Sequence, residues 1–121
     1  MKRKFSTAAV LGLTASVALG MVTAAPAQAA PVPGFKGGTV QWYANGDTVT
    51  VRDTKADGYA FEVSISVHDT SGSHMRSCDT SGYGQTKTCH FDYPEGKQLE
   101  ITGLLNGKGA IHWAGTAYVK S

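Results

Sequence analysis

The chain has 121 residues, of which 41% are hydrophobic and 17% charged, and its formal net charge is +2. This length fits one domain, and the composition is that of a chain with a hydrophobic core rather than of a disordered one. Two cysteines exclude a zinc site made of cysteines alone and a dense disulfide scaffold.

The first 29 residues have the three parts of a secretory signal peptide. A basic start, Met1-Lys2-Arg3-Lys4, is followed by apolar and small residues over 8–25 and by the cleavage motif Ala27-Gln28-Ala29. We expect cleavage after Ala29, because cutting one residue later would place Pro31 beside the scissile bond. The apolar stretch is too rich in glycine and threonine for a stable membrane span, so we expect a secreted protein.

Removal of residues 1–29 reverses the sign of the net charge. That segment holds three of the 11 basic residues and none of the nine acidic ones, which leaves a net charge of −1 and no run of lysine or arginine. A nucleic-acid-binding protein needs a basic patch, and so does a protein bound to an anionic membrane. We therefore expect no nucleic-acid partner and no membrane association after cleavage. We also expect a monomer.

The remaining sequence predicts strands almost throughout. Residues 30–37 contain two prolines and two glycines and are expected to form a flexible lead-in to a single domain over 38–121. Residues 39–44 and 48–53 alternate between apolar and polar side chains around Asn45-Gly46, a strong hairpin signal. Residues 59–68 alternate without interruption, and a period of two over ten residues excludes a helix.

The second half continues this pattern with shorter or less regular strands. They are expected near 74–78, 88–93, 98–105 and 110–119, with a turn at Asn106-Gly107 and a bulge at Gly115. The phase of its strand places Trp113 in the core, together with Trp42 and Phe61. About seven short strands predict an all-β fold, a small antiparallel β-sandwich or a partly open barrel.

Cys78 and Cys89 both lie in the exported part, where an oxidising compartment favours a disulfide. The ten residues between them are polar and glycine-rich, and closing a loop of this size stabilises a small domain by about 3 kcal/mol. A redox-active pair would have the closer Cys-x-x-Cys spacing, so we interpret the disulfide as structural.

Candidate chemical sites are weak in this sequence. Asp47, Asp53 and Asp57 surround the first two turns and are weak calcium candidates, although aspartate is also an ordinary turn residue. The histidines lie on separate segments, and neighbouring His68 and Asp69 would point to opposite faces of a strand, so neither a metal site nor a catalytic triad is expected. We expect no catalytic residue, no metal and no cofactor.

Exposed aromatic side chains are the better binding candidates, because tyrosine and tryptophan on extracellular β-sandwiches can stack against sugars or protein partners. Tyr43 lies on the face of its strand opposite Trp42, and Tyr83 lies between the two cysteines. Both are candidate members of a binding surface.

The stretch 42–59, with its Asn45-Gly46-Asp47 turn and its Ala56-Asp57-Gly58-Tyr59 sequence, resembles small exported proteins of actinomycetes. A cysteine pair and a turn such as Pro94-Glu95-Gly96 often follow in those proteins. The resemblance covers nearly the whole exported part and implies a small secreted all-β protein. It assigns no function and no active site.

These observations favour a non-catalytic extracellular module that binds a protein or a glycan. One alternative is a secreted inhibitor of an extracellular hydrolase that presents the loop between Cys78 and Cys89. A further alternative is a small hydrolase whose site the sequence does not reveal.

We predict that the secreted protein begins at Ala30 and contains no free thiol, because the export signal and the cysteine pair imply both. Intact mass spectrometry before and after thiol alkylation measures this. A mass that includes residues 1–29, or a mass increase from alkylation of the unreduced protein, would contradict it.

Overall fold

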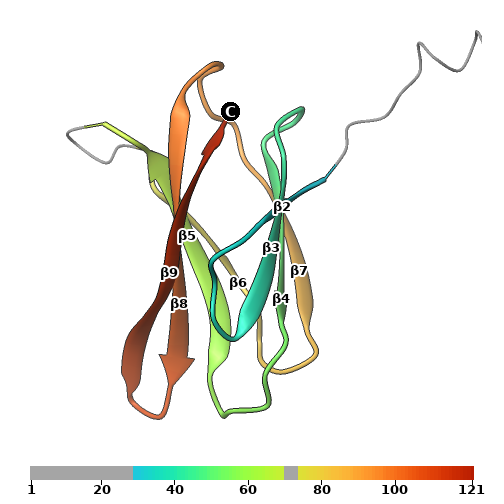
Figure 1. The fold of residues 1–121 in the computed structure, drawn as a ribbon, viewed down its shortest axis with the longest axis vertical. Helices are drawn as coiled ribbons and strands as arrows, with labels where there is room; N and C mark the ends of the chain where they lie inside the picture. The colour runs from blue at the N-terminus through green and yellow to red at the C-terminus, as the bar shows by residue number, and fades with distance from the viewer. Residues whose placement is uncertain (1–28, 70–73) are drawn as a thin grey trace, which may run out of the picture.

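A computed structural model describes residues 29–69 and 74–121, so the predicted signal sequence up to residue 28 and the turn residues 70–73 lie outside the described part. The described residues form eight strands in two four-stranded antiparallel sheets, packed face to face (Figure 1). One sheet has the order β2-β3-β4-β7, with bounds Ala30–Val32, Gly38–Tyr43, Thr48–Asp53 and Thr86–His90. The other has the order β6-β5-β8-β9, with bounds Arg76–Asp79, Ala60–Val67, Gln98–Gly107 and Ala110–Lys120.

The predicted all-β sandwich with one disulfide is therefore confirmed, and the two separate sheets do not form a closed barrel. The strand beyond the expected seven is β2, which lies in the lead-in: Ala30 pairs with Trp42, and Val32 pairs with Val40. The extended conformation that proline favours allows this short strand at the edge of a sheet.

Alternation along the strands builds the core. The inward side chains of β4, β5 and β8 are completely buried or nearly so, whereas their neighbours in sequence are partly exposed. The least exposed of these core residues are Val49, Val51, Phe61, Val63, Ile65, Leu99 and Ile101. Each such side chain contributes about 1.5–3 kcal/mol on burial, so the two inner faces hold the sheets together.

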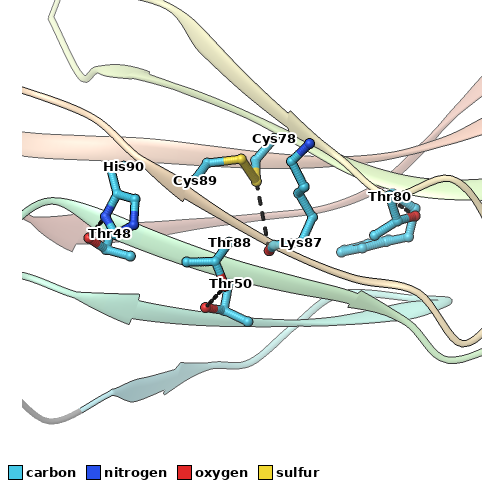
Figure 2. Close-up of a disulfide and its surroundings, with 9 residues drawn as sticks. Thr48, Thr50, Cys78, Thr80, Lys87, Thr88, Cys89 and His90 are labelled. Atoms are coloured by element: carbon cyan, nitrogen blue, oxygen red, sulfur yellow. Dashed lines mark hydrogen bonds between the residues drawn. A yellow bond between two sulfur atoms is a disulfide. The ribbon is translucent and has the colours of Figure 1, made fainter.

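The two open sides of the sandwich are closed differently. On one side, the disulfide Cys78–Cys89 joins edge strand β6 of one sheet to edge strand β7 of the other, with a Cα–Cα distance of 5.9 Å (Figure 2). On the other side, the Trp42 indole N–H donates to the carbonyl of Lys120 at 2.9 Å, and the Lys36 N–H donates to the carbonyl of Ala114 at 2.8 Å. Covalent or hydrogen bonds thus join the two sheets on both open sides.

One of the two predicted Asn-Gly turns is present in the structure and the other is not. Asn45-Gly46 lies in the turn between β3 and β4, as predicted. The predicted turn at Asn106-Gly107 is wrong, because both residues belong to β8 and the turn is made by Lys108 and Gly109. These two have φ values of 53° and 75°, and positive φ at both central positions suits a two-residue hairpin.

A pair of glycines leaves a gap in the inner face of one sheet. Gly103 on β8 and Gly115 on β9 are register partners, and the Phe35 side chain contacts the position that a Cβ on Gly103 would occupy. Phe35 also packs edge-on against Phe61, with ring centroids 6.1 Å apart. The lead-in is thus anchored at both glycines, because the Phe35 ring fills the space beside Gly103 and the backbone of Gly34 and Phe35 lies against Gly115.

We predict that Gly115→Ala destabilises the protein by about 3 kcal/mol or more, because its φ is +133° and a Cβ there would press on the Gly34 carbonyl oxygen. Gly82→Ala is the matched control, since Gly82 has a φ of +138° and open space around it. Urea unfolding of both variants separates contact from backbone strain. Equal losses of stability would show that the contact with the lead-in contributes nothing.

Tyr93 connects the segment after β7 to β5. Its side chain is 3% exposed and its hydroxyl donates to the Ile65 carbonyl at 2.9 Å. Burial raises the pKa of Tyr93 to about 12 from 10.0, and Asp47 adds to the rise while Arg76 opposes it. The neutral phenol is therefore the form that the fold favours.

We predict that this contribution of Tyr93 is present below pH 10 and lost as the pH rises toward 12, since the unfolded chain loses the phenol proton first. The pKa difference corresponds to about 2–3 kcal/mol. In Tyr93→Phe the loss is absent, although the missing hydrogen bond costs about 1 kcal/mol at neutral pH. The unfolding free energies of the two proteins should therefore approach each other above about pH 10, and the wild type should become the less stable protein before the pH reaches about 12; a constant difference would contradict the assignment.

Candidate binding surface

The three aspartates that were weak calcium candidates accept hydrogen bonds from backbone N–H groups at three separate places. An Asp47 carboxylate oxygen accepts from the Tyr93 N–H at 2.9 Å. The Asp53 carboxylate accepts from the Lys55 and Phe61 N–H groups at 3.1 and 3.3 Å, and Asp57 accepts from the Tyr59 N–H at 3.0 Å. These bonds hold the turns at both ends of β4.

Within residues 29–69 and 74–121, no three acidic, histidine or cysteine side chains lie close enough together to hold a metal ion. Asp47 is nearly buried, and its second carboxylate oxygen has no hydrogen-bond partner in the described structure.

The histidines are likewise dispersed. His68 Nδ1 lies 3.4 Å from a Glu100 oxygen, and His90 Nδ1 lies 2.8 Å from the Thr48 hydroxyl. The His112 ring contacts the Tyr59 ring edge-on at 5.3 Å. Ser71 and Ser73, which follow His68 and Asp69 in a polar stretch of the sequence, lie outside the described residues.

The predicted core position of Trp113 is wrong. The residue lies on the surface, with 63% of its side chain exposed. The reason is a shift of register between β8 and β9: Gly103 pairs with Gly115, whereas Leu104 pairs with Trp113. Ala114 is thereby an extra residue in β9, and it takes the buried position instead. The bulge expected near Gly115 is present, and its effect is to turn Trp113 outward.

The shift brings three large side chains to one face of the sheet. Ile111, Trp113 and Tyr118 are 61%, 63% and 50% exposed, and their register partners on β8 alternate with buried residues. We call these three residues the β9 stripe. Strand geometry places Trp113 and Tyr118 about 14 Å apart along the sheet, because their partners on β8 are four residues apart.

Polar neighbours hold the rings of the β9 stripe in place. The Trp113 indole N–H donates to the Thr116 hydroxyl at 3.0 Å, and Tyr118 contacts the His68 ring with centroids 4.8 Å apart. His68 is in turn held by Glu100. An aromatic side chain fixed in this way loses little conformational entropy when a ligand covers it.

A cleft lies at the end of the same sheet. It has a volume of about 550 Å³ and is lined by Gly58, Tyr59, Ser81, Gly82, Tyr83 and Asn106, among others. We call it the loop-end cleft. Tyr83 is 64% exposed there, so the structure brings this predicted binding residue together with a second tyrosine, Tyr59.

The walls of the loop-end cleft are fixed by contacts outside it. The loop that carries Tyr83 is attached to the sandwich, because the Thr80 hydroxyl donates to the Phe61 carbonyl at 2.7 Å and the Gly84 N–H donates to the Asp53 carbonyl at 3.0 Å. The Lys108 ammonium lies 4.7 Å from the centre of the Tyr59 ring. The cleft is therefore largely preformed.

Tyr43, the other predicted binding residue, lies on the opposite sheet and is only partly exposed. Its register partner is Thr48, on a face where threonine hydroxyls bond across strands, as Thr50 and Thr88 do at 3.0 Å (Figure 2). A hollow of about 360 Å³ beside β2 offers only the side chains of Thr39 and Gln41 as polar groups. Neither feature forms a site with Tyr83.

No family model, no curated protein and no solved structure matches this chain. The part of the chain that the structure describes contains no helix long and apolar enough to cross a membrane.

The sequence pattern points to Tyr83 as an exposed aromatic residue, but it does not identify the residues of the β9 stripe. The available signal was the change of phase within 110–119, where Tyr118 falls out of step with Ile111 and Trp113. Once a bulge is placed before Gly115, all three side chains share a face, and that face carries Thr116 and Lys120 rather than the buried Ala114.

Proposed function

We propose that this protein is a secreted, monomeric, non-catalytic module that binds an extracellular protein or glycan through the β9 stripe and the loop-end cleft. The observation that carries the proposal is the exposure of Trp113 and Tyr118 on a strand where each ring is held by a polar neighbour. Exposed aromatic side chains fixed in this way are typical of the energetic centres of binding surfaces.

Two features support the extracellular setting. The disulfide is consistent with an oxidising compartment, and it joins the two sheets of a small domain whose core alone is limited. The resemblance of residues 42–59 to exported proteins of actinomycetes also leads us to expect an extracellular protein.

We predict that the exported part, residues 30–121, retains a partner from the culture medium or cell wall of the producing organism, and that the purified partner rebinds it. Trp113→Ala should weaken this binding about tenfold or more. The matched control is Thr50→Ala, on the outer face of the opposite sheet, and it should bind normally. Retention of nothing by the wild-type protein, or equal binding by Trp113→Ala, would contradict the proposal.

An inhibitor of an extracellular hydrolase is the second candidate, because the loop with Tyr83 is exposed yet attached to both sheets. The same measurement distinguishes it. An inhibitor that presents this loop would lose binding in Tyr83→Ala and keep it in Trp113→Ala. Reduction of the disulfide does not make this distinction, since Cys78 is 1% exposed and the bond joins the two sheets.

A further inference from the structure

The loop-end cleft and the β9 stripe belong to one continuous surface. Asn106 lines the cleft, and its register partner on β9 is Ile111, the first residue of the stripe. The next outward pair along the sheet is Leu104 with Trp113, and the pair Glu100 with Tyr118 lies four residues further along β8. This path from Asn106 to Glu100 is about 20 Å long.

The path alternates between aromatic rings and hydrogen-bonding groups. Between Trp113 and Tyr118 lies the pair Thr102 and Thr116, whose hydroxyl-bearing side chains share the outer face. At the cleft, the Asn106 amide donates to a Glu62 carboxylate oxygen at 3.3 Å. A ligand that fits this path has apolar faces for the rings and hydroxyl groups for the threonine, amide and carboxylate groups between them.

The charge of this surface narrows the class of ligand further. The acidic side chains of this surface are Glu62, Asp79 and Glu100, against which it carries two lysines, Lys120 on β9 and Lys108 beside the Tyr59 ring of the cleft. An anionic polymer would meet net repulsion here, whereas an uncharged one would find carboxylates that accept its hydroxyl protons.

A protein partner fits these features less well. A stable protein interface buries about 800 Å² on each partner around a contiguous apolar centre. In the β9 stripe, the polar pair Thr102 and Thr116 separates Tyr118 from Ile111 and Trp113, and the stripe lies on β9, an edge strand of its sheet.

We propose that the cleft and the stripe together bind a linear oligosaccharide of neutral sugars, with one end in the loop-end cleft and the chain running past Trp113 to Tyr118. This inference rests on the proposed binding function and names its ligand class. Sugar rings have one apolar face of C–H groups that packs on aromatic side chains and a rim of hydroxyls. Tyr59 and Tyr83 surround the terminal residue, and the two rings of β9 support the chain.

The test is isothermal titration of the exported part, residues 30–121, with neutral gluco-, xylo-, manno- and N-acetylchito-oligosaccharides of increasing length. At least one series should bind, and its affinity should rise with length until the ligand spans about 20 Å. Trp113→Ala and Tyr83→Ala should each weaken binding about tenfold, with Thr50→Ala unchanged. A longer ligand should lose more than a short one in Tyr118→Ala, because only the longer ligand reaches that ring.

The outcomes separate this inference from the proposed function. If no neutral sugar binds but a purified protein partner does so through Trp113, the glycan assignment is wrong and the binding function stands. Preference for an anionic polysaccharide would also overturn it. Sugar binding that is unaffected by Trp113→Ala and Tyr83→Ala would disprove the placement, and binding of neither class would remove both proposals. Circular dichroism of each variant verifies that it is folded.

Discussion

One extra residue in β9 determines much of this structure. Ala114 has no register partner on β8. Its presence shifts the pairing of β9 with β8 by one residue between Gly115 and Trp113. On the inner side, this shift places Gly115 opposite Gly103 and opens the space that Phe35 fills. On the outer side, it brings Trp113 and Tyr118 to the same face. The anchoring of the lead-in and the exposure of the aromatic rings are thus two results of one local irregularity.

The two ends of the chain depend on each other through this region. The lead-in covers the inner surface at Gly115, and the Lys36 N–H bonds to the carbonyl of Ala114. Near the end of β9, the carbonyl of Lys120 accepts a hydrogen bond from the Trp42 indole N–H. Because these contacts lie on the side away from the disulfide, both open sides of the sandwich resist separation of the sheets, which leaves the outer face of β9 rigid enough to present fixed side chains.

The sequence predicts most strongly what depends on neighbouring residues. The alternation of 59–68 defines β5, and Asn45-Gly46 marks a turn whose backbone angles glycine permits. The predicted core position of Trp113 is wrong because the direction of its side chain depends on the register shift at Ala114, whose carbonyl accepts the N–H of the distant Lys36. The turn after β8 was misplaced by two residues because Lys108 adopts a positive φ that its own type does not favour. The change of phase within 110–119 signals the bulge but does not show which side chains it turns outward.

The strict separation of inner and outer positions has a consequence for divergence among such chains. Side chains that face outward from β8 and β9 are partly or largely exposed, so substitutions there change the free energy of unfolding little. Gly103, Gly115 and the cysteines have no such freedom. With the binding function that we propose for this face, substitutions at a few outward positions would change the ligand while the sandwich beneath stays constant.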